Sequence, residues 1–252
     1  MPNPIDLVFY LLLGGALGAL GGLFGIGGGL IAIPVLALFF GLNQQHAQGT
    51  ALVMVMPNVL VGLWDYARRG DVDRRVAILL GACAVSFTFV GAWYATHVAG
   101  PGLRFGFAGF VAAIALVFAY RAVRAKAAGP GTPRLAWEWT AVVGALGGVL
   151  SGLFSVGGAV FAVPMLSMLF GYTQTEAQGL SLALVAPGTL VGIATYALSS
   201  DVDWGIGIPL AIGGTACVHF GVGLAHRLPE RTLQLLFCGL LVVTSIALFA
   251  KP

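Results

Sequence analysis

The chain has 252 residues and a formal net charge of +3, and 59% of its residues are hydrophobic while only 8% are charged. A soluble domain carries about 25% charged residues, so this composition excludes a soluble globular protein. The basic residues lie between apolar segments, where they orient a membrane protein, so the net charge does not indicate a nucleic-acid surface. The N-terminus lacks the basic region and cleavage site of a signal peptide, so we expect its first apolar segment to be retained.

Apolar segments follow one another along the whole chain and predict an all-α polytopic membrane protein. Most are close to the roughly 20 residues that cross the hydrocarbon core. The second segment of each half has 12 residues, or about 18 Å of helix, which is too short to cross and predicts a half-length helix. In chain order the segments are 7–24, 30–41, 47–67, 76–98, 103–122, 137–154, 160–171, 177–198, 204–225 and 232–250.

A glycine-rich phrase occurs twice in this apolar sequence. Residues 22–34 read GLFGIGGGLIAIP and residues 152–164 read GLFSVGGAVFAVP, and the offset of 130 continues without a gap to GDVD at 70–73 and SDVD at 200–203. Glycine and proline are costly inside helices, so their repetition predicts a backbone break that is needed twice. Close helix packing through small residues is the alternative. The proline that follows each copy, before a short helix, favours the break.

Loop charge predicts how the halves are related. Arginines flank 70–73 on both sides, whereas 200–203 has no basic neighbour, so the positive-inside rule places the first loop in the cytoplasm and the second outside. Because the linker between the halves is also basic, segment 137–171 must enter the membrane and return to the side it left. This predicts two inverted repeats of five helical elements each, broken at the glycine-rich turns. A four-plus-four arrangement would instead make the repeats parallel. The expected divisions are a first repeat over 1–124, a cytoplasmic linker over 125–136 and a second repeat over 137–252.

The breaks predict a binding site for a small anion. Broken helices in inverted repeats place the substrate where the halves meet, and free N–H groups at a helix start attract anions without a formal charge. A second repeated phrase, HAQGTALVMVMPN at 46–58 and EAQGLSLALVAPG at 176–188, adds neutral donors. Capping by Gln44 and Gln174, and hydrogen bonds from Thr50 or Ser181 to their own backbone, are the structural alternatives. The predicted substrate-binding residues are Gly25, Gly27, Gly28, Gly29, Gln48, Thr50, Asn58, Ser155, Gly157, Gly158, Gln178, Ser181 and Thr189.

No catalytic group, metal site or cofactor is predicted. The glycines do not match a dinucleotide fingerprint, because the third required glycine is missing and no strand precedes them. No serine–histidine or paired-aspartate arrangement indicates an intramembrane enzyme. Among ionisable residues, Asp65 is expected to pair with nearby arginines, and His219 is either a titrating group or a packing histidine. His46 and Glu176 occupy equivalent repeat positions, as gate residues or as helix caps.

The phrases GIGGGLIAIPVL, QGTALV, SVGGAVFAVPML and QGLSLALV resemble the TauE/SafE sulfite-exporter family of bacterial membrane proteins, over nearly the whole chain. The resemblance implies transport of small sulfur oxyanions or organosulfonates, such as sulfite or sulfoacetate, across the inner membrane. The family's Gly-Thr-Ser phrase is split here, because Thr50 is followed by Ala51 and Leu180 precedes Ser181. We expect a transporter, acting as an exporter, that alternates access to a midplane anion site. A small-anion channel is the alternative. The expected partners are the anion and the lipid bilayer. The sequence predicts neither the coupling ion nor the oligomeric state.

Overall fold

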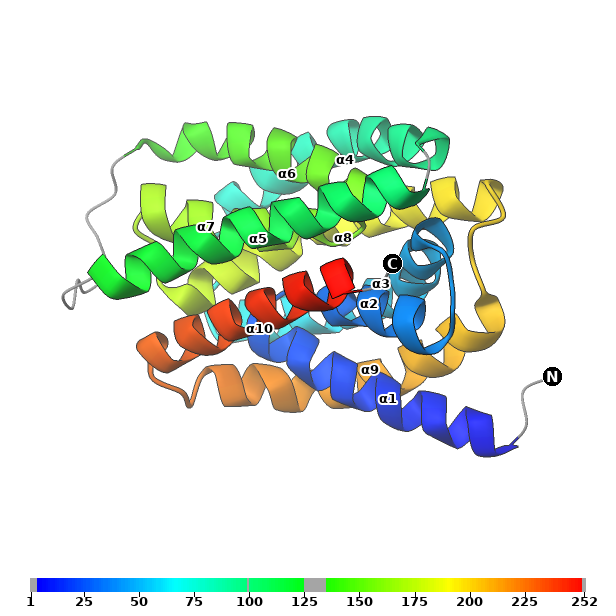
Figure 1. The fold of residues 1–252 in the computed structure, drawn as a ribbon. Coiled ribbons are helices and arrows are strands. Elements are labelled where there is room, and N and C mark those ends of the chain that lie inside the picture. Colours follow the sequence, from blue (N-terminus) through cyan, green and yellow to red (C-terminus); the bar gives the residue numbers. More distant parts are fainter. Residues whose placement is uncertain (1–3, 99, 125–134, 251–252) are drawn as a thin grey trace.

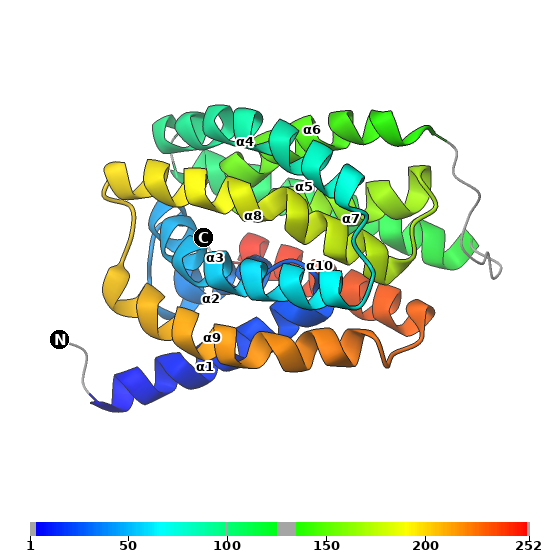
Figure 2. The same ribbon diagram turned by 180° about the vertical axis from the view of Figure 1, so that it is seen from behind.

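The computed structural model describes residues 4–98, 100–124 and 135–250, and the regular elements within them are all helical, which confirms the all-α prediction (Figures 1 and 2). The predicted linker over 125–136 lies outside the described residues except for its last two positions. The first half contains α1 (Pro4–Phe24), α2 (Gly29–Phe39), α3 (Gln44–Arg68), α4 (Arg74–His97) and α5 (Gly100–Arg124). The second half contains a short 3₁₀ turn, η1 (Trp137–Trp139), then α6 (Thr140–Phe154), α7 (Gly157–Leu169), α8 (Gln174–Leu198), α9 (Trp204–Ala225) and α10 (Glu230–Ala250).

The repeat seen in the sequence is also a repeat of helices. α3 and α8 both have 25 residues and begin 130 positions apart, directly after a capping side chain. Asn43 accepts a hydrogen bond from the backbone N–H of His46, and Thr173 forms a reciprocal capping box with Glu176. Glu176 is therefore a helix cap, one of the two roles expected for it. The five helical elements predicted for each half are present in both halves.

The two short helices bring the chain back to the side from which it entered. α2 has 11 residues and α7 has 13, or about 17 and 20 Å of helix. Phe40, after α2, lies with its ring centroid 5.6 Å from that of Tyr10 near the start of α1. In the second half, Leu135 ahead of α6 donates its N–H to the carbonyl of Leu169 at the end of α7, at 3.2 Å. In both halves, therefore, the short helix folds back along the helix that precedes it.

Two seams of small residues join the halves. A Cβ added to Gly18 of α1 would lie 2.2 Å from the carbonyl oxygen of Gly214 in α9, and one added to Gly148 of α6 would lie 2.7 Å from that of Ala84 in α4. The first helix of each half therefore packs, backbone against backbone, on the fourth helix of the other half. The glycines of these seams recur every fourth residue, at Gly14, Gly18 and Gly22 and again at Gly144, Gly148 and Gly152.

Equivalent helices of the two halves run in opposite directions. Gln48, near the start of α3, contacts Tyr196 near the end of α8, and Gln178, near the start of α8, contacts Tyr66 near the end of α3. α5 and α10 are antiparallel as well, since Arg104 donates from its Nε to the carbonyl of Leu248 at 3.0 Å. Reciprocal contacts of this kind indicate an approximate two-fold relation between the halves. The pair α5 and α10 covers one side of the bundle, at the front of Figure 1 and at the back of Figure 2.

Seven of the described helices are long and apolar enough to cross a membrane, and α2, α7 and the apolar stretch 102–117 of α5 are shorter. Large apolar side chains on the outside of the bundle, such as Phe220, Ile212 and Ile78, are exposed. In a bilayer these side chains contact lipid, so the fold is that of a multi-pass membrane protein. We call the end of the bundle that carries loop 69–73 the basic face, because arginines flank this loop, and the end that carries loop 199–203 the opposite face.

Candidate substrate site at the two chain breaks

The first break is a tight turn that only glycine can form. Gly25, Gly27 and Gly28 have φ angles of +66°, +69° and +89°, a left-handed region that other residues enter at a cost. The turn is also pressed against its neighbours, because a Cβ on Gly25 would lie 2.5 Å from the Cβ of Gln178. The predicted break between α1 and α2 is therefore confirmed at these three glycines. Gly29 has no positive φ and is the first residue of α2.

The turn leaves a row of backbone donors free at the start of α2. Within the described chain, the N–H groups of residues 27–30 donate no hydrogen bond, whereas the carbonyl of Gly28 accepts from both Ile31 and Ala32. Free N–H groups and the positive end of the helix dipole coincide here. This arrangement favours an anion and needs no charged side chain.

The second break is built from other residues than those expected. Ser155 has a φ of +62° and ends α6, Val156 follows with a φ of −130°, and Gly157 already begins α7. Gly158 lies inside α7, where a Cβ would come within 2.5 Å of the carbonyl oxygen of Gly147. The expectation that Gly157 and Gly158 turn the chain is thus wrong. Ser155 makes the turn in their place, and Gly158 allows close packing of α7 on α6.

The two breaks meet in the middle of the bundle. A Cβ on Gly29 would lie 2.5 Å from Cγ2 of Val156, so the start of α2 touches the second turn. Gln48, Thr50, Gln178 and Ser181 are all 0% exposed. The site between the turns is therefore closed to both faces in this conformation.

Two buried glutamines, Gln178 beside the first turn and Gln48 linked through Tyr196 to the end of α6, have unpaired amide donors. The hydroxyl of Tyr66 lies 2.9 Å from Oε1 of Gln178, and the hydroxyl of Tyr196 lies 2.7 Å from Oε1 of Gln48. The Nε2 atoms of both glutamines are buried without a hydrogen-bond partner in the described structure. A buried donor without a partner is costly, so these two donors, in equivalent repeat positions, are candidates for binding a substrate.

Four of the remaining predicted residues have structural partners, whereas the hydroxyl of Ser155 is buried without a hydrogen-bond partner in the described structure. Ser181 donates to the carbonyl of Gly25 at 2.8 Å, and Nδ2 of Asn58 donates to the carbonyl of Gly27 at 3.3 Å, so both hold the first turn in place. Thr50 accepts from the N–H of Asp203 at 2.9 Å, and Thr189 donates to the carbonyl of Ala186 in its own helix. Ser181 also bonds its own helix, at the carbonyl of Gln178.

The tyrosines were not assigned a role from the sequence, although both occur at repeated positions. Tyr66 and Tyr196 are 0% exposed, and each hydroxyl also lies near a carbonyl at the end of a helix, that of Gly22 at 3.0 Å and that of Gly152 at 3.5 Å. Their spacing of 130 within the repeat was the available signal. Each tyrosine connects the end of α1 or α6 to the glutamine that faces the site.

Three aspartate–histidine pairs lie around the bundle. Asp65 pairs with His219 at 2.7 Å, not with the arginines expected as its partners, because α9 brings the imidazole to the buried carboxylate. The side chain of His219 is 62% exposed, so it is not the buried group considered from the sequence. On the opposite face Asp201 pairs with His46 at 3.2 Å, and burial raises the pKa of this loop carboxyl although the imidazole opposes the shift. The third pair joins Asp71 to His226 on the basic face.

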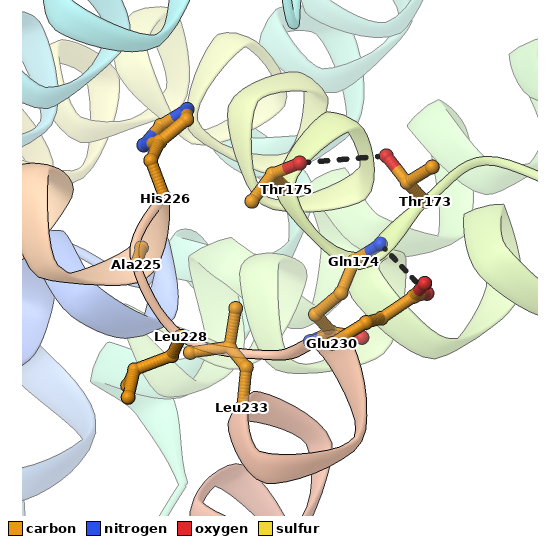
Figure 3. Close-up of a pocket in the computed structure, with 8 residues that line it drawn as sticks. All are labelled: Thr173, Gln174, Thr175, Ala225, His226, Leu228, Glu230 and Leu233. Carbon is orange, nitrogen blue, oxygen red and sulfur yellow. Dashed lines mark hydrogen bonds between the residues drawn. The ribbon is translucent and has the colours of Figure 1, made fainter.

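A pocket of about 260 Å³ opens beside this third pair, between the start of α8 and the α9–α10 connection (Figure 3). Gln174 lines it with both polar atoms of its carboxamide buried and unpaired, so it does not cap α8, a role that Thr173 performs. The lining residues are Thr173, Gln174, Thr175, Ala225, His226, Leu228, Glu230 and Leu233.

Comparison with known proteins identifies the family. The profile of the family described as Sulfite exporter TauE/SafE matches residues 10–248. A probable membrane transporter protein of Xylella fastidiosa (strain 9a5c) is 30% identical over 223 residues, covering 86% of this chain and 82% of the relative. The probable membrane transporter protein YdhB of Bacillus subtilis is 24% identical, covering 91% of this chain and 93% of the relative. No solved structure gives a significant match. The chain belongs to the TauE/SafE sulfite exporter family, as a multi-pass membrane transporter of the bacterial inner membrane.

Proposed function

We propose that the protein exports small sulfur-containing anions, such as sulfite or organosulfonates, through a site between the two chain breaks. Family membership supports transport, and the observation that carries the anion assignment is the pair of unpaired amide groups on Gln48 and Gln178. Gln178 packs against Gly25 of the first turn, which precedes the free N–H groups at the start of α2, and Gln48 is linked through Tyr196 to Gly152 near the end of α6. Neutral donors bind an oxyanion without a second charge that would have to be desolvated.

The helix contacts suggest which parts move. The seams join α1 to α9 and α6 to α4, and Thr50 of α3 accepts from the N-cap residue of α9. On the other side Gly179 of α8 lies against Val72, just ahead of α4, where a Cβ would come within 2.9 Å. We infer two rigid bodies, α1–α3–α9 and α4–α6–α8, each containing helices of both repeats. Alternating access then moves these bodies against each other, instead of moving 1–124 against 137–252.

The two tyrosine–glutamine contacts are placed to control the two faces in turn. Both cross from α3 to α8, Tyr66–Gln178 towards the basic face and Tyr196–Gln48 towards the opposite face. Separation of the bodies at one face breaks one contact and retains the other. With the basic face in the cytoplasm, as the arginines predict, an exported anion enters past Tyr66 and leaves past Tyr196.

The test replaces one amide donor by an oxygen of the same size. Gln178→Glu keeps the Oε1 acceptor for Tyr66 but removes the Nε2 donor and adds a negative charge. A hydrogen bond to a charged group contributes about 1.5–3 kcal/mol, so anion affinity should fall roughly 10- to 150-fold. The assay is a thermal-shift titration of purified protein with sulfite, sulfate, thiosulfate and methanesulfonate.

The matched control is Gln44→Glu. This carboxamide is also buried and unpaired, but it lies at the very start of α3, one turn from Gln48 towards the opposite face. Gln44→Glu should leave the anion affinity within about twofold of the wild-type value. It therefore measures the general effect of a buried carboxylate away from the proposed site. Unchanged binding in Gln178→Glu would contradict the site, and movement of a cation without sulfite or sulfonates would contradict the function.

A channel would use the same donors, and the occlusion of the site distinguishes the two functions. Gln48 and Gln178 are 0% exposed, so the site is closed to both faces here, as the occluded state of a carrier would be. Counterflow in proteoliposomes measures this directly, because only a carrier exchanges labelled internal anion for external anion. Absence of counterflow together with anion conductance would establish the channel.

A further inference from the structure

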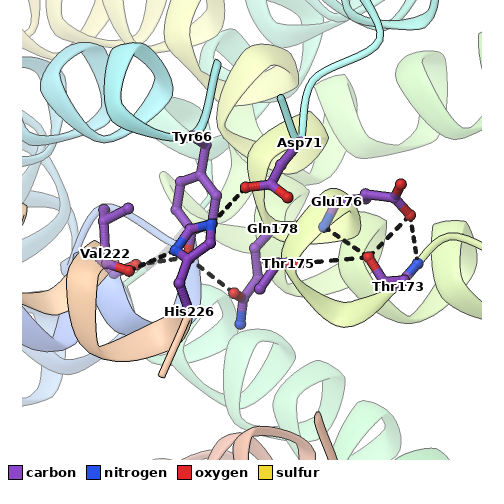
Figure 4. Close-up of polar contacts among 9 residues, drawn as sticks. Tyr66, Asp71, Thr173, Thr175, Glu176, Gln178, Val222 and His226 are labelled. Atoms are coloured by element: carbon purple, nitrogen blue, oxygen red, sulfur yellow. Dashed lines mark hydrogen bonds and ion pairs between the residues drawn. The ribbon is translucent and has the colours of Figure 1, made fainter. Parts of the chain in front are cut away.

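The strongest unassigned feature is the contact between Asp71 and His226 at the basic face (Figure 4). Nε2 of His226 lies 2.5 Å from Oδ2 of Asp71, and Nδ1 lies 2.7 Å from the carbonyl oxygen of Val222. A carbonyl and a carboxylate both accept hydrogen bonds and donate none. A neutral imidazole has one N–H, so it can serve only one of these two acceptors. The geometry therefore requires a second proton, carried either by the ring as imidazolium or by the carboxyl of Asp71.

The other histidines do not share this geometry. In the described structure, His46, His97 and His219 contact their partners through Nδ1 alone. A neutral imidazole with its proton on Nδ1 satisfies each of them. His226 is thus singled out among the four histidines of the chain by an acceptor at both ring nitrogens.

The pair lies between the pocket and the proposed substrate site. His226 lines the pocket, and its ring centroid is 5.2 Å from that of Tyr66, whose hydroxyl reaches Gln178 (Figures 3 and 4). Asp71 belongs to the loop that packs against the start of α8, where a Cβ on Gly179 would lie 3.4 Å from its carbonyl oxygen. The N–H of Asp71 donates to the carbonyl of Tyr66 at the end of α3, so the Asp71–His226 contact ties the end of α9 to the α3–α4 loop at the point where this loop leaves α3 and packs on α8.

Other charged groups around the ring act in both directions. Glu230 of α10 shares the pocket with His226 and favours a positive imidazolium. Two arginines oppose a positive ring. Arg227 follows His226 in sequence, and the guanidinium of Arg69 approaches α9 at Gly223, where a Cβ would lie 3.8 Å from Nη2. The start of α8 contributes only neutral Thr173, Gln174 and Thr175 to the pocket.

We propose that the Asp71–His226 pair is a proton-binding site, and that the bound proton keeps the basic face closed. Without it, the single N–H of a neutral imidazole can donate to Asp71 or to Val222 but not to both, so the contact between α9 and the α3–α4 loop loses one hydrogen bond and is weakened. The closed state then binds one proton more than the open state. By linkage, each unit of rising pH shifts the ratio of open to closed protein by up to about tenfold. Its role in admitting the anion rests on the proposed function, whereas the proton site itself does not.

The first test reads the proton directly and needs no substrate. Protein labelled with ¹⁵N-histidine in nanodiscs gives imidazole ¹⁵N shifts that distinguish a doubly from a singly protonated ring, and His226→Gln assigns the signal. We expect the folded wild-type pair to carry the second proton that its geometry requires, seen as a doubly protonated His226 ring or as a neutral ring whose Nε2 accepts from a protonated Asp71. In Asp71→Asn the His226 ring should become neutral, because the new amide N–H donates to Nε2. A neutral His226 ring that carries its proton on Nε2, or that leaves Nε2 without a partner, at pH 6 in the wild type would overturn the proposal.

The second test measures how far the basic face opens as the pH changes. Hydrogen exchange of segments 70–73 and 222–231, corrected for the intrinsic pH dependence, should accelerate up to about tenfold per pH unit in the wild type. In Asp71→Asn the acceleration should fall below about twofold, because closure no longer needs the proton. Asp201→Asn, on the opposite face, should keep the wild-type response and serves as the control. A pH response that persists in Asp71→Asn would contradict the assignment, and neither measurement depends on the identity of the anion.

Discussion

Substitution of Gly18 by alanine tests whether the α1–α9 seam is set by direct backbone contact. The added Cβ would lie 2.2 Å from the carbonyl oxygen and 2.4 Å from the Cα of Gly214, where ordinary contact begins at 3.4 Å. Backbone atoms cannot rotate away, so the helices must separate by about 1 Å. Overpacking of this kind costs about 1–3 kcal/mol, and the better helix propensity of alanine returns about 0.5–1 kcal/mol. We expect Gly18→Ala to lose about 0.5–2 kcal/mol of unfolding free energy.

The matched control is Gly109→Ala in α5, where no heavy atom lies within 4 Å of the added Cβ. It should gain up to about 1 kcal/mol from helix propensity alone. Gly148→Ala in the second seam should fall between the two, since its closest backbone contact is 2.7 Å. Thermal unfolding in one detergent gives the order, with about 2–4 °C for each kcal/mol in a chain of this size. A Gly18→Ala protein that is as stable as Gly109→Ala would refute close backbone packing as the basis of the seam.

Two further predictions concern the second break and the opposite face. Ser155→Gly should raise the unfolding temperature, because Ser155 has a φ of +62° and a left-handed serine costs about 1–2 kcal/mol. The greater freedom of glycine in the unfolded chain offsets part of this gain. A lower unfolding temperature would show that the serine hydroxyl stabilises the fold by more than the backbone strain destabilises it. Burial raises the pKa of Asp201, so the folded carboxyl holds its proton to a higher pH than the unfolded carboxyl does. The unfolding free energy of the wild type, relative to that of Asp201→Asn, should therefore rise as pH falls through the folded pKa towards the unfolded value of 3.8. Unfolding temperatures of both proteins from neutral pH down to about pH 4 check this, and a constant difference between them would contradict it.

The sequence predicted the architecture because its strongest signals are local. Residues 30–41 and 160–171 are too few to cross the membrane, so the half-length helices α2 and α7 were predicted without a structure. The same holds for the break at Gly25–Gly28, since only glycine adopts those φ angles cheaply.

The sequence misled where a glycine serves contact and not conformation. Gly158 matches Gly28 in the repeat, yet it packs on Gly147 while Ser155 turns the chain. A valine at Gly28 or Gly158 therefore cannot distinguish anion binding from packing, because its Cβ would lie 2.6 Å from the carbonyl oxygen of Leu17 or 2.5 Å from that of Gly147. Gln178→Glu avoids the added volume, and Gln44→Glu accounts for the negative charge that it introduces.

The sequence by itself determined the membrane class, the ten helices and the two breaks, because hydropathy, glycine conformation and loop charge act within a few neighbouring residues. Only the tertiary structure decided which side chains meet across the bundle. Positions between 64 and 196 residues apart are joined by three features: the packing of α1 on α9 and of α6 on α4, the Tyr66–Gln178 contact and the Asp71–His226 pair. No local pattern records such distances, since they depend on how closely small residues let whole helices approach.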